Sequence, residues 1–454
     1  MILTIAGGGS TFTPGITAMM LERHNEFKVT ELRLYDNDGL RQSKIAVIIK
    51  ILIEKSGLNI KLIETTDPKT AFTNANFIFG QFRVGKYEMR EKDEKIPLKY
   101  GVIGQETCGP GGLAYGLRTI YPMIELIDYC DKYAAKDHWI INYSNPAAIV
   151  AEGCRKARPS ARIINICDMP VALLEFMSNI IDCDVSELDA DYYGLNHFGW
   201  FTSILYDGKE QIPMLRSYIE KNGLIGPKYL KYLNGDAETT KDLNPQLLRH
   251  LKASWKKTMT NQKHLVQLDE NKLFNSYLQY YLIGDKIVSE SNPDFTRTNE
   301  VIRDRETPLF EGIDKYLKTG ELDEGLFYAG AHGGFIVDVA NSLMHDEGKK
   351  FIVMVTNNGI IPNLPDEAII EVPANLYKDG PVPIQQNEIE HFQLGMIQQQ
   401  LASEKLIVEA AFENSYNKAL QSFTLNATTP SVLVAKQILD EMIEANKDYW
   451  PELR

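Results

Sequence analysis

The chain has 454 residues, of which 44% are hydrophobic and 24% are charged, and its formal net charge is −13. This composition is typical of a globular chain long enough for two domains, and the negative charge argues against nucleic-acid or membrane partners. The five cysteines are scattered and odd in number, which indicates reduced thiols and hence a cytoplasmic protein. We see neither a basic leader nor the roughly 20 consecutive apolar residues that a membrane span needs.

Short β-branched runs alternate with helical patterns over about the first 180 residues. The expected strands are ILTIA (2–6), ELRLYD ending at Asp36, NIKLIETT (59–66), FIFGQFRV (77–84), HWIINYS (138–144) and RIINICD ending at Asp168. The expected helices cover residues 14–24, 40–55, 113–132 and 146–157. Such alternation predicts an α/β fold with a parallel sheet and crossover helices, so residues 1–170 are expected to form a Rossmann-like domain that binds NAD.

The pattern changes after about residue 170. A strand pair is expected around DYYGLNHFGWFTSILYDGKEQIP (191–213), with Asp207-Gly208 as a hairpin turn, before longer helical stretches begin. Residues 171–454 are therefore expected to form a mixed α+β domain for catalysis, substrate binding and oligomerisation, with the site between the two domains. The amphipathic pattern at about 430–446 is interpreted as a helix packed on the core.

A glycine-rich loop, AGGGSTFTPG (6–15), follows the first strand and opens a helix. Backbone amides and the helix dipole at such a place can hold a pyrophosphate. Phe12 replaces the third glycine of the dinucleotide fingerprint, and a turn without a ligand is the alternative interpretation. Asp36, at the end of the second strand, can accept hydrogen bonds from a ribose diol, which favours NAD over NADP. The other candidate contacts of the cofactor all lie in the loop: Gly7, Gly9, Ser10 and Thr11.

Eight separated motifs, taken in order, resemble family 4 of the glycoside hydrolases. They are AGGGSTFTPG, RVGKYEMR (83–90), GQETCGPGG (104–112), NYSNPAAI (142–149), ICDMP (166–170), GLNHFGW (194–200), NSYLQYYL (275–282) and SNPDFTRTNE (291–300). The resemblance covers essentially the whole chain. CDMP (167–170) is similar to the branch that hydrolyses 6-phospho-α-glucosides; the phospho-β-glucosidases have asparagine after the cysteine, and branches acting on unphosphorylated sugars have histidine.

The resemblance implies a lactate/malate dehydrogenase-like fold and an NAD-dependent glycosidase, a known exception to the usual pair of catalytic carboxylates. In this family the sugar C3 hydroxyl is oxidised by hydride transfer to NAD, the acidified C2 proton is removed, and the C1 leaving group is expelled. Water then adds at C1 and the hydride returns to C3. The implied substrate is a 6-phospho-α-glucoside such as maltose 6'-phosphate, with a divalent metal, Mn²⁺, as second cofactor and a homodimer or homotetramer as the assembly.

The resemblance also implies roles for four residues at the reacting end of the sugar. Cys167 and His197 match the metal ligands, although a thiolate by itself would favour zinc or iron. Asp168 matches the general acid and Tyr277 the base that takes the C2 proton. Each residue also has a structural alternative. Cys167 could be a packed thiol and His197 a hydrogen-bonded imidazole. Asp168 could be a helix N-cap, and Tyr277 could belong to an aromatic stripe with its neighbours.

Three further residues match substrate contacts of the family. Asn145 can hydrogen-bond sugar hydroxyls, with a turn before the following proline as its alternative role. Arg90 and Arg297 carry guanidinium groups that suit a phosphate, although surface arginines are common.

Other functions stay open at this point. A 6-phospho-β-glucosidase or an unphosphorylated α-glycosidase of the same family would share most of these motifs. A 2-hydroxy-acid dehydrogenase would accumulate NADH, and a catalytically silent NAD-binding sensor would bind nucleotide without turnover.

Overall fold

The computed structural model describes residues 1–235, 243, 255–321 and 330–454. Within these residues one 13-stranded sheet runs through the molecule in the order β10-β8-β7-β12-β11-β6-β5-β4-β1-β2-β3, with β13 paired to β12 and β9 to β8. The strands are β1 (Ile2–Ala6), β2 (Glu31–Tyr35), β3 (Lys61–Thr65), β4 (Phe77–Gly80), β5 (Trp139–Asn142), β6 (Ile163–Asn165), β7 (Leu188–Leu195), β8 (Phe198–Tyr206), β9 (Lys209–Glu210), β10 (Leu273–Phe274), β11 (Lys349–Thr356), β12 (Ile369–Tyr377) and β13 (Gly380–Pro383).

The first six strands are all parallel and lie in the order β3-β2-β1-β4-β5-β6. This is the order of a Rossmann sheet, as the alternating pattern predicted. Every residue of β4 and β5 is buried, because helices cover both faces of such a sheet. The helices of this part are α1 (Thr13–Glu22), α2 (Gly39–Ser56), α3 (Pro68–Phe72), α4 (Lys86–Lys99), α5 (Gly109–Tyr133), α6 (Ala147–Ala157) and α7 (Met169–Ile181).

The remaining strands continue the same sheet in antiparallel pairs, beginning with β11 beside β6. The expected strand pair is β7 and β8, but Asn196 and His197 form its turn. Asp207-Gly208 instead joins β8 to the short strand β9, and both of its residues have the positive φ that a tight hairpin turn requires. Our placement of the main hairpin turn was therefore wrong, while the turn at Asp207-Gly208 is confirmed.

The second half of the chain supplies the other helices. They are the α-helices α8 (Ile212–Asn222), α9 (Pro227–Leu233), α11 (Trp255–Leu265), α12 (Gln279–Leu282), α13 (Gly284–Ser289), α14 (Arg297–Val301), α15 (Thr307–Thr319), α16 (Gly330–His345), α17 (His391–Glu413), α18 (Tyr416–Leu425) and α19 (Val432–Ala445), the 3₁₀ turns η1 (Val185–Glu187), η3 (Val266–Leu268) and η4 (Ser276–Leu278), and the π-helical turn η5 (Ile302–Glu306). α19 buries one apolar face against α4, α5 and α18, which confirms core packing for the last helix. None of the described helices is both long and apolar enough to cross a membrane.

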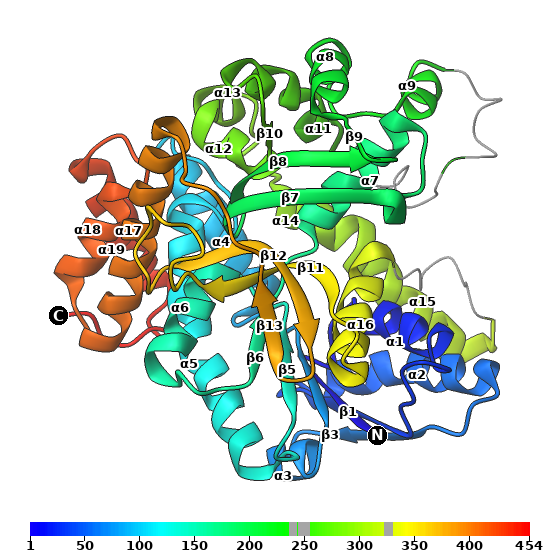
Figure 1. The fold of residues 1–454 in the computed structure, drawn as a ribbon. Coiled ribbons are helices and arrows are strands. Elements are labelled where there is room, and N and C mark those ends of the chain that lie inside the picture. Colours follow the sequence, from blue (N-terminus) through cyan, green and yellow to red (C-terminus); the bar gives the residue numbers. More distant parts are fainter. Residues whose placement is uncertain (236–242, 244–254, 322–329) are drawn as a thin grey trace.

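Late elements complete the nucleotide-binding half. α16 packs against α1, and a Cβ at Gly333 would lie only 2.9 Å from the carbonyl oxygen of Gly15. α15 packs against α2, and both late helices share one apolar core with β1 and β2 (Figure 1). The domain boundary at residue 170 stays a prediction.

Candidate active site

Cys167 and His197 lie against each other at the centre of the candidate site. The Cys167 Sγ is 3.3 Å from the His197 Nε2, and both side chains are buried. Cys167 follows the end of β6, where parallel sheets place their sites. A metal held by one sulfur and one nitrogen at typical bond lengths separates the two atoms by about 3.1–3.6 Å, so the pair fits two adjacent positions on one ion. Among the described residues no group of three or more histidine, cysteine or acidic side chains could hold a metal.

The backbone of His197 has a conformation that few non-glycine residues adopt. Its φ is +62°, in the left-handed region, because it forms the tip of the two-residue turn between β7 and β8. Its imidazole stacks on the ring of Tyr277, with centroids 4.2 Å apart and an interplanar angle of 7°. This contact brings together a proposed metal ligand and the proposed base, which are far apart in the sequence.

Burial sets the protonation of the pair. It lowers the pKa of His197 to about 4, so the imidazole is neutral at neutral pH, the form that binds metals. Burial also raises the pKa of Cys167 well above its ordinary value, with the Asp168 carboxylate adding to the effect. The thiol therefore keeps its proton unless a cation comes close, and metal binding would release that proton.

Asp168 occupies the N-cap position of α7, but its side chain makes no capping hydrogen bond. The expected N-cap position is therefore confirmed, but without the side-chain hydrogen bond that usually favours aspartate there. Its φ and ψ are already helical, and the Asp168 carbonyl accepts from the Ala172 amide at 2.8 Å. Burial raises the pKa values of Cys167, Tyr143 and Glu175, and the nearby Asp168 carboxylate adds to each rise.

Tyr277 is held by a hydrogen-bonded chain in its own segment. Its amide donates to the Asn275 Oδ1 at 3.0 Å, and the Asn275 Nδ2 donates to the Tyr192 hydroxyl at 3.0 Å. Burial raises the pKa of Tyr277 well above its ordinary value, and the acidic groups around it, Glu106 among them, raise it further. The phenol is therefore a poor base until positive charge lies beside it. Tyr280 and Tyr281 are partly buried aromatic neighbours that contact Tyr277 and Phe198, as expected for packing residues.

Asn145 presents an acceptor with no partner. Its Nδ2 donates to the Tyr143 carbonyl at 3.4 Å, whereas its Oδ1 is buried without a hydrogen bond from the described residues. A buried amide oxygen without a partner is costly, so it indicates a contact that a ligand supplies. This observation favours substrate binding over a purely local turn role.

Arg90 is a buried side chain rather than a surface arginine. Its Nε donates to Glu94 and its Nη2 pairs with Glu106, each at 3.0 Å. Glu106 also pairs with Arg83. The remaining nitrogen of Arg90, Nη1, makes no hydrogen bond within the described part of the chain, so one donor stays available for a substrate.

Arg297 begins α14 close to the same cluster. The amide of its neighbour Thr298 donates to the Glu94 Oε2 at 2.8 Å, so Glu94 links Arg90 on α4 to the start of α14. The Arg297 side chain is 37% exposed and pairs with Glu300 at 2.8 Å. The structure thus brings the two expected arginines together.

The glycine-rich loop has the close packing that a dinucleotide site needs. Gly7 has a φ of +92°, and a Cβ there would lie 2.8 Å from the Gln81 carbonyl oxygen. A Cβ at Gly9 would lie 3.0 Å from the Asp36 carboxylate. The loop residue Ser10 turns its Oγ back to accept from the Phe12 amide at 3.2 Å. Glycine is therefore required at both positions, as in the tight turn of a dinucleotide-binding loop.

Asp36 holds the loop as well as lying where a ribose is expected. One carboxylate oxygen accepts from the Gly9 amide and the other from the Asp38 amide, both at 2.9 Å. The Thr11 amide donates to no group in the described part of the chain, which leaves a donor for a phosphate. Each Asp36 oxygen keeps a further lone pair for a ribose hydroxyl.

Hydrogen bonds connect the nucleotide loop to the metal pair along the carboxyl ends of the strands. The Gln81 Nε2 donates to the Thr13 hydroxyl at 2.8 Å, and the Phe82 amide donates to the Ser144 hydroxyl at 3.2 Å. The Ser144 amide in turn donates to Asn142, which bonds Asn165 at 2.7 Å, two residues before the cysteine. The cofactor loop and the metal pair therefore belong to one edge of one sheet.

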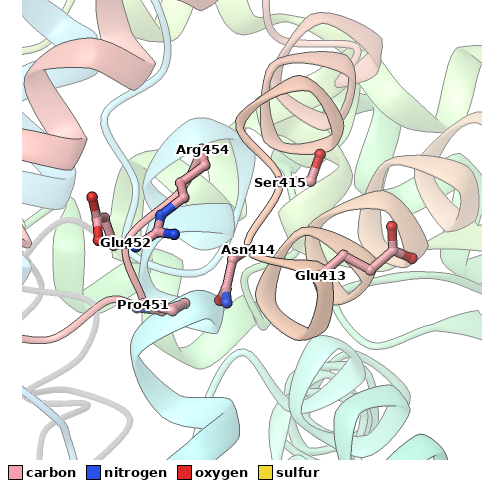
Figure 2. A pocket seen from close by; sticks show the side chains of 6 residues that line it. All are labelled: Glu413, Asn414, Ser415, Pro451, Glu452 and Arg454. Atoms are coloured by element: carbon pink, nitrogen blue, oxygen red, sulfur yellow. Dashed lines mark hydrogen bonds and ion pairs between the residues drawn. The ribbon is translucent and has the colours of Figure 1, made fainter.

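One surface pocket in the described part of the chain lies away from these residues. It has a volume of about 560 Å³ and is formed by the end of α17 and the last residues of the chain (Figure 2). Its lining residues are Glu413, Asn414, Ser415, Pro451, Glu452 and Arg454. It contains none of the expected site residues.

Sequence reasoning missed two acids near the site, of which Glu106 is partly buried and Glu371 is fully buried. Glu106 was quoted only within a motif, yet it joins Arg83 and Arg90. Glu371 lies on β12, is fully buried, and accepts from the Asn196 amide group at 3.3 Å beside the hairpin turn. A charged residue inside the apolar run IIEVPANL was the available signal, because buried carboxyls need a specific environment.

The fold and site together define an NAD-dependent type of enzyme with a buried thiol–imidazole pair beside the nucleotide loop. The model of the family "Family 4 glycosyl hydrolase" matches residues 2–183, and "Family 4 glycosyl hydrolase C-terminal domain" matches residues 192–429. The chain therefore belongs to family 4 of the glycosyl hydrolases. It is 44% identical over 453 residues to the maltose-6'-phosphate glucosidase MalH of Clostridium acetobutylicum, covering 99% of both chains.

Solved structures agree with this assignment. A 6-phospho-α-glucosidase from gut microorganisms in complex with NAD and glucose 6-phosphate has a TM-score of 0.94 and 46% identity, with 100% of both chains covered. A second 6-phospho-α-glucosidase from gut microorganisms, in complex with NAD and Mn²⁺, has a TM-score of 0.92 and 39% identity, covering 100% of this chain and 99% of the other. A lactate dehydrogenase, with a TM-score of 0.51, 14% identity, and 90% and 98% coverage, shares the fold alone.

Proposed function

We propose that the protein hydrolyses 6-phospho-α-glucosides such as maltose 6'-phosphate, releasing glucose 6-phosphate and the aglycone, with NAD and a divalent metal, Mn²⁺, as cofactors. The observation that carries this proposal is the Cys167–His197 pair at the same sheet edge as the glycine-rich loop. The full-length similarity to maltose-6'-phosphate and 6-phospho-α-glucosidases supports the substrate class.

Cys167 and His197 would hold the metal, and the glycine-rich loop with Asp36 would hold NAD. When bound, NAD accepts and returns a hydride, and the metal supplies Lewis-acid stabilisation of negative charge on sugar oxygens. The metal pair is buried, so the site excludes bulk water from the reacting sugar.

Asp168 would hand a proton to the departing glycosidic oxygen. Its side chain does not cap α7, and it follows the ligand cysteine directly. Tyr277 would take the C2 proton through its phenol oxygen, held in place by its stacking on His197. These two groups divide acid and base work between them.

Three residues would position the phosphosugar. The unpaired Asn145 Oδ1 accepts from a sugar hydroxyl, and the Arg90 Nη1 and the Arg297 guanidinium donate to anionic or hydroxyl oxygens. The half-exposed Arg297 is the better phosphate partner, because two carboxylates already balance the charge of Arg90. We place the enzyme in the cytoplasm as a homodimer or homotetramer, in line with its reduced thiols.

The test is release of p-nitrophenol from the α- and β-anomers of p-nitrophenyl glucoside 6-phosphate and from the unphosphorylated α-glucoside. We expect cleavage of the α-phosphosugar alone, lost when NAD is omitted or the metal is chelated and restored by Mn²⁺. Preference for the β-anomer would make the protein a phospho-β-glucosidase, and equal cleavage of the unphosphorylated sugar would refute the phosphate requirement. Steady NADH formation with hydroxy acids and no cleavage would refute the reaction class.

A further inference from the structure

An ion pair joins the nucleotide loop to a segment far along the chain. The Arg41 Nε, in the first turn of α2, donates to the Gly9 carbonyl at 2.7 Å. Its two terminal nitrogens form a bidentate pair with Glu306, in which the Nη2 lies 2.9 Å from the Oε2. Glu306 ends the π-helical turn η5, 265 positions further along the chain. The Arg41 guanidinium also lies 4.7 Å from the ring centroid of Phe310 on α15.

This place in the fold decides which dinucleotide binds. In a Rossmann sheet, an acid at the end of the second strand accepts from the ribose 2'-hydroxyl of NAD, or a nearby arginine takes the 2'-phosphate of NADP. This chain has both groups: Asp36 accepts from the Gly9 amide, and Arg41 donates to the carbonyl of the same glycine. The arginine suited to a 2'-phosphate is therefore present, but the terminal nitrogens of its guanidinium group are already paired with Glu306.

We propose that Glu306 is a specificity-determining residue that selects NAD against NADP by occupying Arg41. The bidentate carboxylate uses the geometry that a phosphate would need, and its negative charge adds to that of Asp36. The inference depends on the proposed dinucleotide site, but it assigns the selection to an acid from the second half of the chain. The sequence of the glycine-rich loop does not indicate this role of Glu306.

Two other cations lie near the loop. Lys86 is held by Asp38 at 2.5 Å and is 61% exposed at its side chain. The Arg305 guanidinium lies 4.3 Å from the Phe12 ring centroid, and its Nη2 donates to the Tyr87 hydroxyl at 3.1 Å. In the described part of the chain neither makes a hydrogen bond or ion pair with Gly9 or Asp36, whereas Arg41 bonds both Gly9 and Glu306.

The experiment measures the dissociation constants of NAD and NADP for the full-length protein by isothermal titration calorimetry. In Glu306→Gln the guanidinium becomes free for a 2'-phosphate, and the ratio of the NADP constant to the NAD constant should fall at least about tenfold. Glu306→Asp keeps the negative charge on a shorter side chain, so the ratio of the NADP constant to the NAD constant should fall less in this variant. If Glu306→Gln does not fold, as judged by circular dichroism, the Glu306→Asp ratio decides.

Two further variants separate this effect on dinucleotide selection from a general weakening of the contact between α2 and α15. Asp314→Asn removes the 2.8 Å pair with Lys44 that links the same helices, α2 and α15, and should leave the ratio unchanged. Arg41→Met combined with Glu306→Gln should return the ratio to that of the parent protein.

The outcomes are distinct. An unchanged ratio in Glu306→Gln, an equal fall in Asp314→Asn, or a fall that persists without Arg41 each overturns the inference while leaving the NAD site intact. Failure of the parent protein to bind NAD would instead refute the dinucleotide site and the proposed function with it.

Discussion

Glu404 on α17 gives a stability prediction whose size follows from the structure. Its carboxyl is buried, and the Gln400 Nε2 donates to its Oε1 at 2.8 Å. Burial, with a smaller contribution from the Glu152 carboxylate, raises its pKa from 4.5 to about 8 against the opposing hydrogen bond from Gln400, and no cation is among the groups that shift it. The folded chain therefore keeps this proton at neutral pH.

The sign of the pH dependence follows from the raised pKa. Between pH 4.5 and 8 the unfolded chain releases the Glu404 proton and the folded chain keeps it, so the free energy of unfolding falls as pH rises. Below pH 4.5 both states hold the proton, and above pH 8 both have lost it. The full shift corresponds to roughly 5 kcal/mol of lost stability.

Glu404→Gln removes the ionisation and keeps an acceptor for Gln400. We expect the stability difference between variant and parent, from urea unfolding followed by circular dichroism, to grow in the variant's favour from pH 5 to pH 8.5. Glu409→Gln makes the same chemical change on α17 where the pair with Lys418 is half-exposed, and should shift stability by less than about 1 kcal/mol. If the free energies of unfolding of Glu404→Gln and the parent change with pH in parallel, the raised pKa of Glu404 is refuted.

Three predictions concern the reaction. Asp168→Asn should lower the turnover of unactivated disaccharide phosphates about 10²-fold or more. The turnover of aryl glycosides should fall less, because a good leaving group hardly needs a proton. Equal losses on both substrates would rule out the acid role. Tyr277→Phe should end exchange of the substrate C2 proton with deuterated water, and exchange that continues would show another base. Cys167→Ser should weaken Mn²⁺ binding in equilibrium dialysis at least about tenfold, and an unchanged affinity would exclude ligation by the thiol.

The parallel half of the fold could be predicted because its signals are local. The alternation of buried strands with helices, and the glycine loop after the first strand, specify β1 to β6 without knowledge of the rest. The hairpin at His197 was harder, because Asp207-Gly208 is a stronger turn signal than Asn196-His197. The left-handed φ of His197 follows from the two-residue turn that joins the paired strands β7 and β8, and sequence alone does not reveal that pairing.

Long-range pairs were beyond sequence reasoning for a physical reason. Arg90 and Arg297 were expected from motifs, but the carboxylates that hold them and the link through Glu94 are set by the packing of α4 on α14. An ion pair such as Arg41 with Glu306 leaves no spacing pattern. Its partners meet only after α15 has packed on α2.

The site as a whole is built to be inactive without positive charge. Burial keeps the thiol of Cys167 and the phenol of Tyr277 protonated, and it keeps the imidazole of His197 neutral. These three shifts have one cause, the low dielectric of the site, and each disfavours a charged side chain. A divalent cation reverses the balance for both the thiolate and the phenolate at once, because each gains an opposite charge nearby. In the proposed roles, the same burial that makes Tyr277 a poor base in isolation would couple its basicity to metal binding, because its stacking on His197 holds it beside a proposed ligand of that metal.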